Sequence, residues 1–124
     1  MAAKSVKELI VYQKTYRPAM LIYEATKKFP PEKRYALTSQ IRRSSRSVCL
    51  NLREAWAKRK YHAHFISRLN ECDGENSETD SALDFARDCQ YISTEQHAEY
   101  SLLSQETGRM LGSMINNPQP FIIP

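Results

Sequence analysis

The segment that decides the fold is residues 32–59, EKRYALTSQIRRSSRSVCLNLREAWAKR, which contains neither glycine nor proline. Its apolar and small residues recur every three or four positions, the spacing that places side chains on one face of an α-helix. The segment therefore predicts a long amphipathic helix. Its expected buried face consists of Leu37, Ile41, Ser44 or Ser45, Val48, Leu52 and Ala55.

The segments on either side have the same helical periodicity. Phe29-Pro30-Pro31 ends a first helix that starts near Ser5, because proline cannot continue a helix. A third helix is expected from the junction at residues 61–64 to about Tyr91, and a fourth from about residue 94 to residue 115. The pairs Ser5/Glu8 and Ser93/Gln96 have the spacing of a capping box, which marks a helix start. The expected inward residues of these helices are Leu9, Tyr12, Tyr16, Met20, Tyr23 and Thr26 or Lys27; Phe65, Leu69, Cys72, Asn76, Thr79, Leu83 and Ala86; and Leu103, Met110 and Met114.

Four long helices with short links predict an all-α protein, an antiparallel up-and-down four-helix bundle. The bundle is expected to form a single domain over residues 1–117, followed by an apolar, proline-containing tail over residues 118–124. The tail is expected not to be helical and to dock in a groove of its own or a neighbouring subunit. Only three glycines are present, which disfavours a turn-rich sheet protein. Gly74 is expected to allow a close approach between helices.

The composition favours a cytoplasmic protein. No apolar stretch reaches the roughly 18 residues that span a bilayer, and the N-terminus lacks the apolar core of a signal peptide. The three cysteines, Cys49, Cys72 and Cys89, are odd in number and form no Cys-x-x-Cys pair. Each is expected to be a buried or half-buried free thiol, and no membrane partner is expected.

Charge is strongly segregated along the chain. Residues 27–68 carry twelve basic and two acidic side chains, whereas residues 69–124 carry two basic and ten acidic ones. Such segregation indicates an interaction surface. The alternative is that the two parts neutralise each other within one bundle.

No motif indicates catalysis. The chain has no glycine-rich phosphate loop, no Gly-x-Ser-x-Gly and no His-Glu-x-x-His. His62 and His64 are two residues apart, so on a helix they point in nearly opposite directions and cannot share a metal. We therefore expect no enzymatic activity, no catalytic residue, no metal and no cofactor.

A basic stripe on the second helix is the most informative feature for function. At about 100° per residue, Arg42, Arg46, Arg53 and Lys60 share one stripe with Trp56, the only tryptophan. Lines of cations with an interleaved aromatic residue suit phosphate backbones and unstacked bases. The predicted nucleic-acid-binding residues are Arg42, Arg43, Arg46, Arg53, Trp56, Lys58, Arg59 and Lys60.

A polar set occupies the opposite flank of the same helix. Ser47, Asn51 and Glu54 border the expected core, where a covered Asn51 should make directed hydrogen bonds. Two interpretations are open, a polar link that fixes helix register and a contact between subunits.

The sequence resembles the four-helix bundle proteins named after bacterial 23S rRNA intervening sequences. The resemblance covers about residues 9–115 and is carried by Phe29-Pro30, Gln40-Ile41-Arg42-Arg43-Ser44-Ser45-x-Ser47-Val48, Asn51-Leu52-x-Glu54-Ala55, Gly74, Glu78 and Gly108-Arg109-Met110-Leu111. It implies an up-and-down bundle that assembles into a homopentamer. Some relatives of this family, the accessory variability proteins of retroelements, bind nucleic acid and a reverse transcriptase. By the same resemblance, Glu78 joins Ser47, Asn51 and Glu54 as an oligomer-interface or structural polar residue.

Two functional hypotheses follow. In the first, the chain is a homo-oligomer that binds RNA or DNA through its basic second helix. In the second, it is a protein-assembly module in which that helix meets the acidic third helix of a neighbouring subunit.

Overall fold

Four α-helices form the protein, as the sequence predicts. The computed structural model describes residues 5–31 and 34–123. Within these ranges a short 3-10 turn lies at either end of the helices, and no helix is long and apolar enough to cross a membrane. The elements are η1 (Val6–Glu8), α1 (Ile10–Thr26), α2 (Arg34–Ala57), α3 (His62–Asp88), α4 (Thr94–Asn116) and η2 (Gln119–Phe121).

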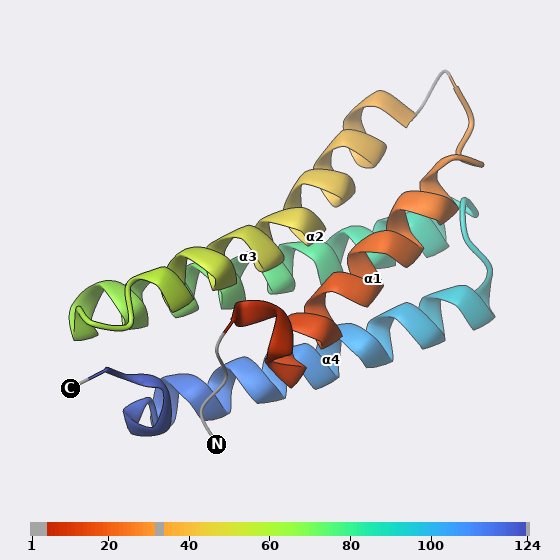
Figure 1. Ribbon diagram of the computed structural model, residues 1–124. Coiled ribbons are helices and arrows are strands. Elements are labelled where there is room, and N and C mark those ends of the chain that lie inside the picture. The colour runs from red at the N-terminus through yellow and green to blue at the C-terminus, as the bar shows by residue number, and fades with distance from the viewer. Residues whose placement is uncertain (1–4, 32–33, 124) are drawn as a thin grey trace.

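Successive helices run antiparallel and lie side by side (Figure 1). α1 packs on α2, α2 on α3 and α3 on α4, and α4 closes the bundle against α1. The α2–α3 link and η2 lie at one end, and the α1–α2 and α3–α4 links lie at the other (Figure 1). The arrangement confirms the predicted up-and-down bundle.

α1 buries a different face from the one predicted. Tyr16, Met20 and Tyr23 are exposed by 53%, 44% and 41%. Leu9 and Tyr12 are half-buried against the core. The prediction favoured the stripe with the larger side chains, but α1 packs between α2 and α4, where small side chains allow close approach. The buried residues are Val11, Thr15, Pro18, Ala19, Ile22 and Thr26.

The start of α1 also differs from the prediction. The Ser5 hydroxyl accepts a hydrogen bond from the Lys7 N–H at 3.2 Å and caps η1 instead of α1. α1 begins only at Ile10, after Leu9, which makes no side-chain capping bond. By contrast, the predicted capping box of α4 is confirmed: Ser93 Oγ accepts from the Gln96 N–H at 3.0 Å, and the Ser93 N–H donates to Gln96 Oε1 at 2.9 Å.

The link between α2 and α3 lies earlier in the chain than expected. α2 ends at Ala57 and α3 begins at His62, with Tyr61 as its N-cap. His62 and His64 therefore lie in the first turn of α3, where both are exposed. Lys60 lies in the link, so it cannot continue the predicted helical stripe.

The inward faces of α2 and α3 are confirmed, with Leu37 and Asn76 half-buried at their edges. In α4, Met114 is buried as predicted, and Met110 packs half-buried against the core cluster that contains Phe65. Leu103 is also half-buried, and small polar residues occupy half of the fully buried positions of this helix. The buried residues of α4 are Tyr100, Ser101, Ser104, Thr107, Leu111 and Met114.

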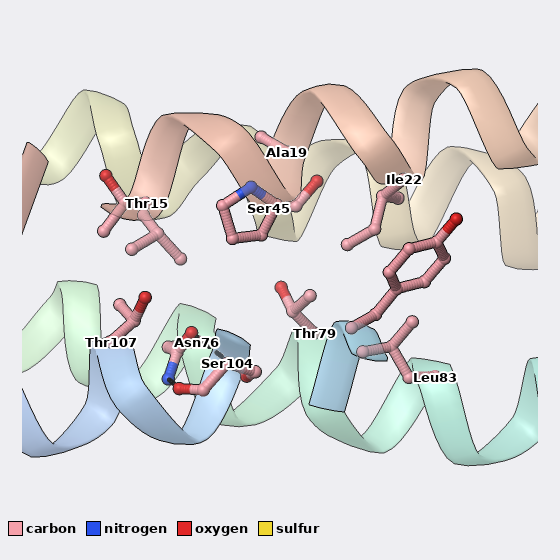
Figure 2. Close-up of a pocket in the computed structure, with 12 residues that line it drawn as sticks. Thr15, Ala19, Ile22, Ser45, Asn76, Thr79, Leu83, Ser104 and Thr107 are labelled. Atoms are coloured by element: carbon pink, nitrogen blue, oxygen red, sulfur yellow. Dashed lines mark hydrogen bonds between the residues drawn. The ribbon is translucent and has the colours of Figure 1, made fainter. Parts of the chain in front are cut away.

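The core consists of two apolar clusters. One, around Phe65, Leu69 and Leu111, lies toward the α2–α3 link, and the other, around Ile22, Ile41 and Leu83, lies toward the opposite end. Between them each helix contributes small polar side chains, and Thr79 Oγ1 donates to Ser44 Oγ at 2.8 Å. Figure 2 shows several of these side chains facing one another across the bundle. We call them the hydroxyl layer: Thr15, Ser44, Ser45, Thr79, Ser104 and Thr107.

The cavity in the hydroxyl layer measures about 10 Å³. This is far below the volume that holds a small-molecule ligand. The hydroxyl layer therefore has no room for a small-molecule ligand.

Gly74 and Cys89 differ from expectation. Gly74 is exposed, and a Cβ added there would meet nothing within 4 Å, so it permits no close approach. Cys49 and Cys72 are buried as predicted, but Cys89 is exposed because it follows the last turn of α3. Burial raises the pKa of the Cys72 thiol to about 12, and it also raises the pKa of Cys49.

The apolar tail docks on its own chain. Phe121 and Ile122 pack against the core cluster that contains Phe65, and the Ile123 N–H donates to the Arg59 carbonyl at 3.3 Å. The tail also contains η2, so the expectation that it is entirely non-helical is wrong.

Candidate functional site

Three of the predicted basic residues lie along the edge of α2 that borders α1. Arg42 is half-buried there. Its Nε donates to Thr26 Oγ1 at 2.7 Å, and its guanidinium lies 4.7 Å from the centre of the Tyr23 ring. Arg46 and Arg53 follow on the same edge and are exposed. The stripe predicted from Arg42 to Arg53 is thus a real feature of the α1/α2 seam.

α1 supplies aromatic side chains to the same seam. Tyr12 and Tyr16 line one hollow with Arg53, and Tyr23 lines a second hollow with Arg42 and Arg46. Sequence reasoning placed these tyrosines in the core. The sequence signal that identifies these tyrosines as surface residues is a second stripe on α1. This stripe consists of small residues one position away from the tyrosines, and it packs inward instead. The α1/α2 face, as we name this surface, comprises Lys7, Tyr12, Tyr16, Arg17, Tyr23, Lys27, Arg42, Arg46 and Arg53. Arg43 also lines the hollow around Tyr23, although its guanidinium is paired with carboxylates of α3.

Most cations of the α1/α2 face have no carboxylate partner. Within residues 5–31 and 34–123, no ion pair involves Lys7, Arg17, Arg46 or Arg53. The Arg46 Nε donates to the Arg42 carbonyl at 3.1 Å, which orients that side chain along the helix. Uncompensated cations beside exposed aromatic rings give this face a positive potential and an apolar floor.

Trp56 lies near the end of the bundle and not on the α1/α2 face. The Arg59 guanidinium stacks 3.5 Å from the centre of the Trp56 ring, and Arg59 Nε donates to the Trp56 carbonyl at 2.8 Å. The half-buried indole lines a hollow with residues from α1, α4 and the tail, including Met110 and Phe121. Because Arg59 stacks on the indole, one face of the Trp56 ring is already covered. Lys58 and Lys60 are exposed beside it.

Arg43 turns toward α3. Its guanidinium pairs with Glu75 at 3.2 Å and with Glu78 at 2.5 Å. These contacts raise the pKa of Arg43 and, chiefly through the Arg43 hydrogen bond, lower the pKa of the Glu78 carboxyl. Gln40 Nε2 also donates to Glu78 Oε1 at 3.5 Å. Basic α2 and acidic α3 thus neutralise each other locally, inside one chain.

The predicted polar set also links α2 to α3. Asn51 Nδ2 donates to the Ser47 carbonyl at 3.0 Å, and Asn51 Oδ1 accepts from Arg68 at 3.4 Å. The same guanidinium pairs with Glu54 at 3.1 Å and Glu71 at 2.8 Å. Asn51 and Glu54 thus link α2 to α3 through Arg68, whereas Ser47 contributes only its carbonyl, to Asn51 of the same helix. Sequence reasoning missed Arg68 because Asn51 and Glu54 lie on another helix.

Hydrogen bonds also connect α3 to α4. Asn76 Nδ2 donates to the Ser104 carbonyl at 2.9 Å, Ser101 Oγ donates to Asp80 at 2.9 Å, and His97 Nε2 lies 2.8 Å from Asp84 Oδ1. These contacts use part of the acidic segment to hold the helices in register. In the part of the chain that the structure describes, no cluster of three or more His, Cys, Asp or Glu side chains could hold a metal ion.

Comparison with known proteins establishes the family. A family model described as 23S rRNA-intervening sequence protein matches residues 7–113. The chain belongs to this family. The chain is also similar to a solved structure, the crystal structure of a protein with unknown function from the S23 ribosomal protein family from Bacteroides thetaiotaomicron VPI-5482. It is 30% identical, covers 87% of this chain and 100% of its own, and gives a TM-score of 0.80. No curated protein matches the chain.

Proposed function

We propose that this member of the 23S rRNA-intervening sequence protein family is a non-enzymatic, homo-oligomeric protein that binds nucleic acid through the α1/α2 face. One observation carries the proposal. Four cations of the α1/α2 face have no carboxylate partner among the described residues: Lys7, Arg17, Arg46 and Arg53. A bound polyanion would supply the negative charge that the chain itself does not place beside these cations.

The position of the acidic residues supports this assignment. Exposed carboxylates lie on α3 and α4, away from the α1/α2 seam: Asp73, Asp84, Asp88, Glu95 and Glu99. Phosphates would be attracted to one side of the bundle and repelled from the other. Such a charge distribution orients a bound strand, and the release of counterions makes its affinity depend on salt.

The test compares two charge reversals that change the net charge equally. Arg53→Glu alters the α1/α2 face, and Arg109→Glu alters an exposed position on α4. We expect Arg53→Glu to weaken binding of a fluorescent RNA or DNA oligomer at least tenfold more than Arg109→Glu does, since contacts to charged groups contribute about 1.5–3 kcal/mol. The double variant Arg46→Glu/Arg53→Glu should abolish binding. Equal losses in both single variants would contradict the proposal.

A second candidate function is protein assembly. It is favoured by large apolar side chains that are exposed on three helices, with Tyr16 and Met20 on α1, Phe85 on α3 and Leu102 on α4. Glu75 and Glu78 are already paired with Arg43 of the same chain. The basic α2 of a neighbouring subunit would therefore meet other acidic residues of α3, such as the exposed Asp73.

Light-scattering mass, recorded with absorbance at 260 and 280 nm, separates the two functions. A pentamer-sized peak that loses nucleic acid only as salt rises supports the nucleic-acid proposal and the assembly implied by the family resemblance. A nucleic-acid-free oligomer that Arg46→Glu/Arg53→Glu dissociates supports assembly instead. A monomer contradicts the homo-oligomeric part of the proposal.

A further inference from the structure

We propose that the nucleic acid bound by the α1/α2 face is single-stranded, and that Tyr16 stacks on one of its unpaired bases. This inference rests on the proposed function and specifies its ligand. RNA and DNA share the required chemistry, an unstacked base on a flexible anionic backbone.

Tyr16 has the properties of a stacking platform. It is 53% exposed, although tyrosine on a bundle helix normally buries its ring. Tyr12 lies behind it, with the ring centres 6.2 Å apart and the planes inclined by 35°, so Tyr16 is supported from within the bundle. The hollow around it is lined by Lys7, Arg17 and Arg53. A base on the ring would place its phosphates among three cations.

Tyr23, at the other end of the face, is occupied by cations of its own chain. The Arg42 guanidinium lies 4.7 Å and the Lys27 ammonium 4.9 Å from the centre of its ring. Arg42 is held there by its hydrogen bond to Thr26. This end therefore offers positive charge to a backbone and little ring surface to a base.

The face thus has a stacking end at Tyr16 and a phosphate-binding end at Tyr23. The two tyrosines are seven residues apart on α1, or about 10 Å at 1.5 Å per residue. A flexible strand can lay one base on Tyr16 and run its backbone along this distance toward Arg46 and Arg42.

A duplex cannot use both ends. Its bases are stacked on one another and expose only their edges in the grooves, so it could contact the cations but would leave Tyr16 without a partner. Base–aromatic stacking requires an unstacked base and tolerates any sequence, because every base has a π-face. The exposed ring therefore favours a single strand over a duplex.

The test measures fluorescence anisotropy with an oligouridylate of about ten nucleotides, its deoxy counterpart, and a duplex of matched charge. Tyr16→Ser should weaken binding of the single strands about tenfold, whereas Tyr16→Phe, which keeps the ring, should bind as the unmodified protein does. Tyr61→Ser removes another exposed tyrosine, in the α2–α3 link, and serves as the matched control.

The salt dependence separates stacking from charge. Arg53→Gln should reduce the slope of log affinity against log salt by about 0.7, the value for one phosphate contact on a single strand. Tyr16→Ser should lower the affinity and leave this slope unchanged. A slope that falls in Tyr16→Ser would show that the ring acts only by positioning a cation, and would overturn the stacking role.

The remaining outcomes distinguish this inference from the proposed function. Equal affinity for duplex and single strand, with Tyr16→Ser binding as the unmodified protein does, would overturn the inference and leave the proposed function intact. No salt-dependent binding of any of the three probes would contradict the proposed function itself. Tighter binding of a single strand than of the duplex, weakened by Tyr16→Ser, supports the inference whether the strand is RNA or DNA.

Discussion

Arg43 and Arg46 lie three residues apart on α2 and line the same hollow, yet their guanidinium groups differ in their partners. Arg43 reaches across the α2/α3 seam to Glu75 and Glu78, whereas Arg46 lies on the α1/α2 face and pairs with no carboxylate that the structure describes. A basic helix therefore need not act as one unit. Its α3 side uses charge to hold the bundle together, and its α1 side leaves charge available for a partner.

Charge reversal at the two arginines gives the largest expected contrast in stability. Arg43→Glu would place a third carboxylate beside Glu75 and Glu78, so we expect the free energy of unfolding to fall by about 1–2 kcal/mol. Arg46→Glu removes no ion pair and should change it by less than about 0.5 kcal/mol. Urea denaturation of both variants measures the difference. Equal losses would show that the two surfaces do not differ as described.

The α3/α4 contacts extend the comparison to neutral hydrogen bonds. Asn76 both donates to the Ser104 carbonyl and accepts from the Ser104 hydroxyl, at 2.9 and 3.2 Å. Asn76→Ala leaves both Ser104 groups without this partner, which should cost about 1–2 kcal/mol in thermal or urea unfolding. Asn70→Ala is the control. Exposed Asn70 bonds to the Ile66 carbonyl of its own helix and to no other residue among those that the structure describes, so its loss should not lower stability.

Gly74 tests whether the outer side of α3 makes any contact. Since an added Cβ would meet nothing within 4 Å, Gly74→Ala should raise the free energy of unfolding by about 0.5–1 kcal/mol through the lower entropy of the unfolded chain. At Gly108 a Cβ would lie 3.4 Å from Asn76 Nδ2, so the gain from Gly108→Ala should be smaller. A loss of stability in Gly74→Ala would indicate that a partner helix packs there.

Lowering the pH should remove the stabilisation that the Arg43–Glu78 pair gives, which is the smallest effect expected. The Arg43 hydrogen bond lowers the pKa of Glu78 in the folded protein. The pair therefore stabilises the fold above the unfolded carboxyl pKa of about 4.3, and this stabilisation is lost as pH falls through the lower folded value. Unmodified protein should be more stable than Arg43→Met at neutral pH, with the gap closing in acid. A gap that is independent of pH would assign the effect to packing of the arginine stem.

The sequence predicted the fold well where one stripe of each helix is clearly apolar. In α2 and α3, residues such as Leu52 and Leu69 stand against polar neighbours, so periodicity alone identifies the buried side. α1 carries two stripes, one of tyrosines and one of small residues. Single-helix reasoning favoured the larger side chains. Because α1 packs closely between two helices, the stripe of small residues is the one that is buried.

The candidate site could be predicted only in part, for a related reason. Helix angles placed Arg42, Arg46 and Arg53 on one edge, and the structure agrees. They could not show that Arg43 finds Glu75, that Arg68 gathers Asn51 and Glu54, or that Arg59 covers Trp56, because these contacts depend on a second helix or on where α2 ends. The tyrosines that complete the face were identified only when the packing of α1 was known.

The hydroxyl layer has a consequence for how the bundle opens. Some of its hydroxyls bond to carbonyls of their own helices, as Thr15 does to Tyr12 and Ser45 to Arg42. Other bonds cross between helices: Thr79 to Ser44, Ser104 to Asn76 and Thr107 to the Lys14 carbonyl. Separating the helices at this level would exchange these few crossing bonds for bonds to water and expose little apolar surface, whereas separating them at either cluster would wet large side chains. Breathing of the native protein should therefore begin at its middle. The two ends, each closed around its own apolar cluster, should behave as distinct cooperative units in amide hydrogen exchange.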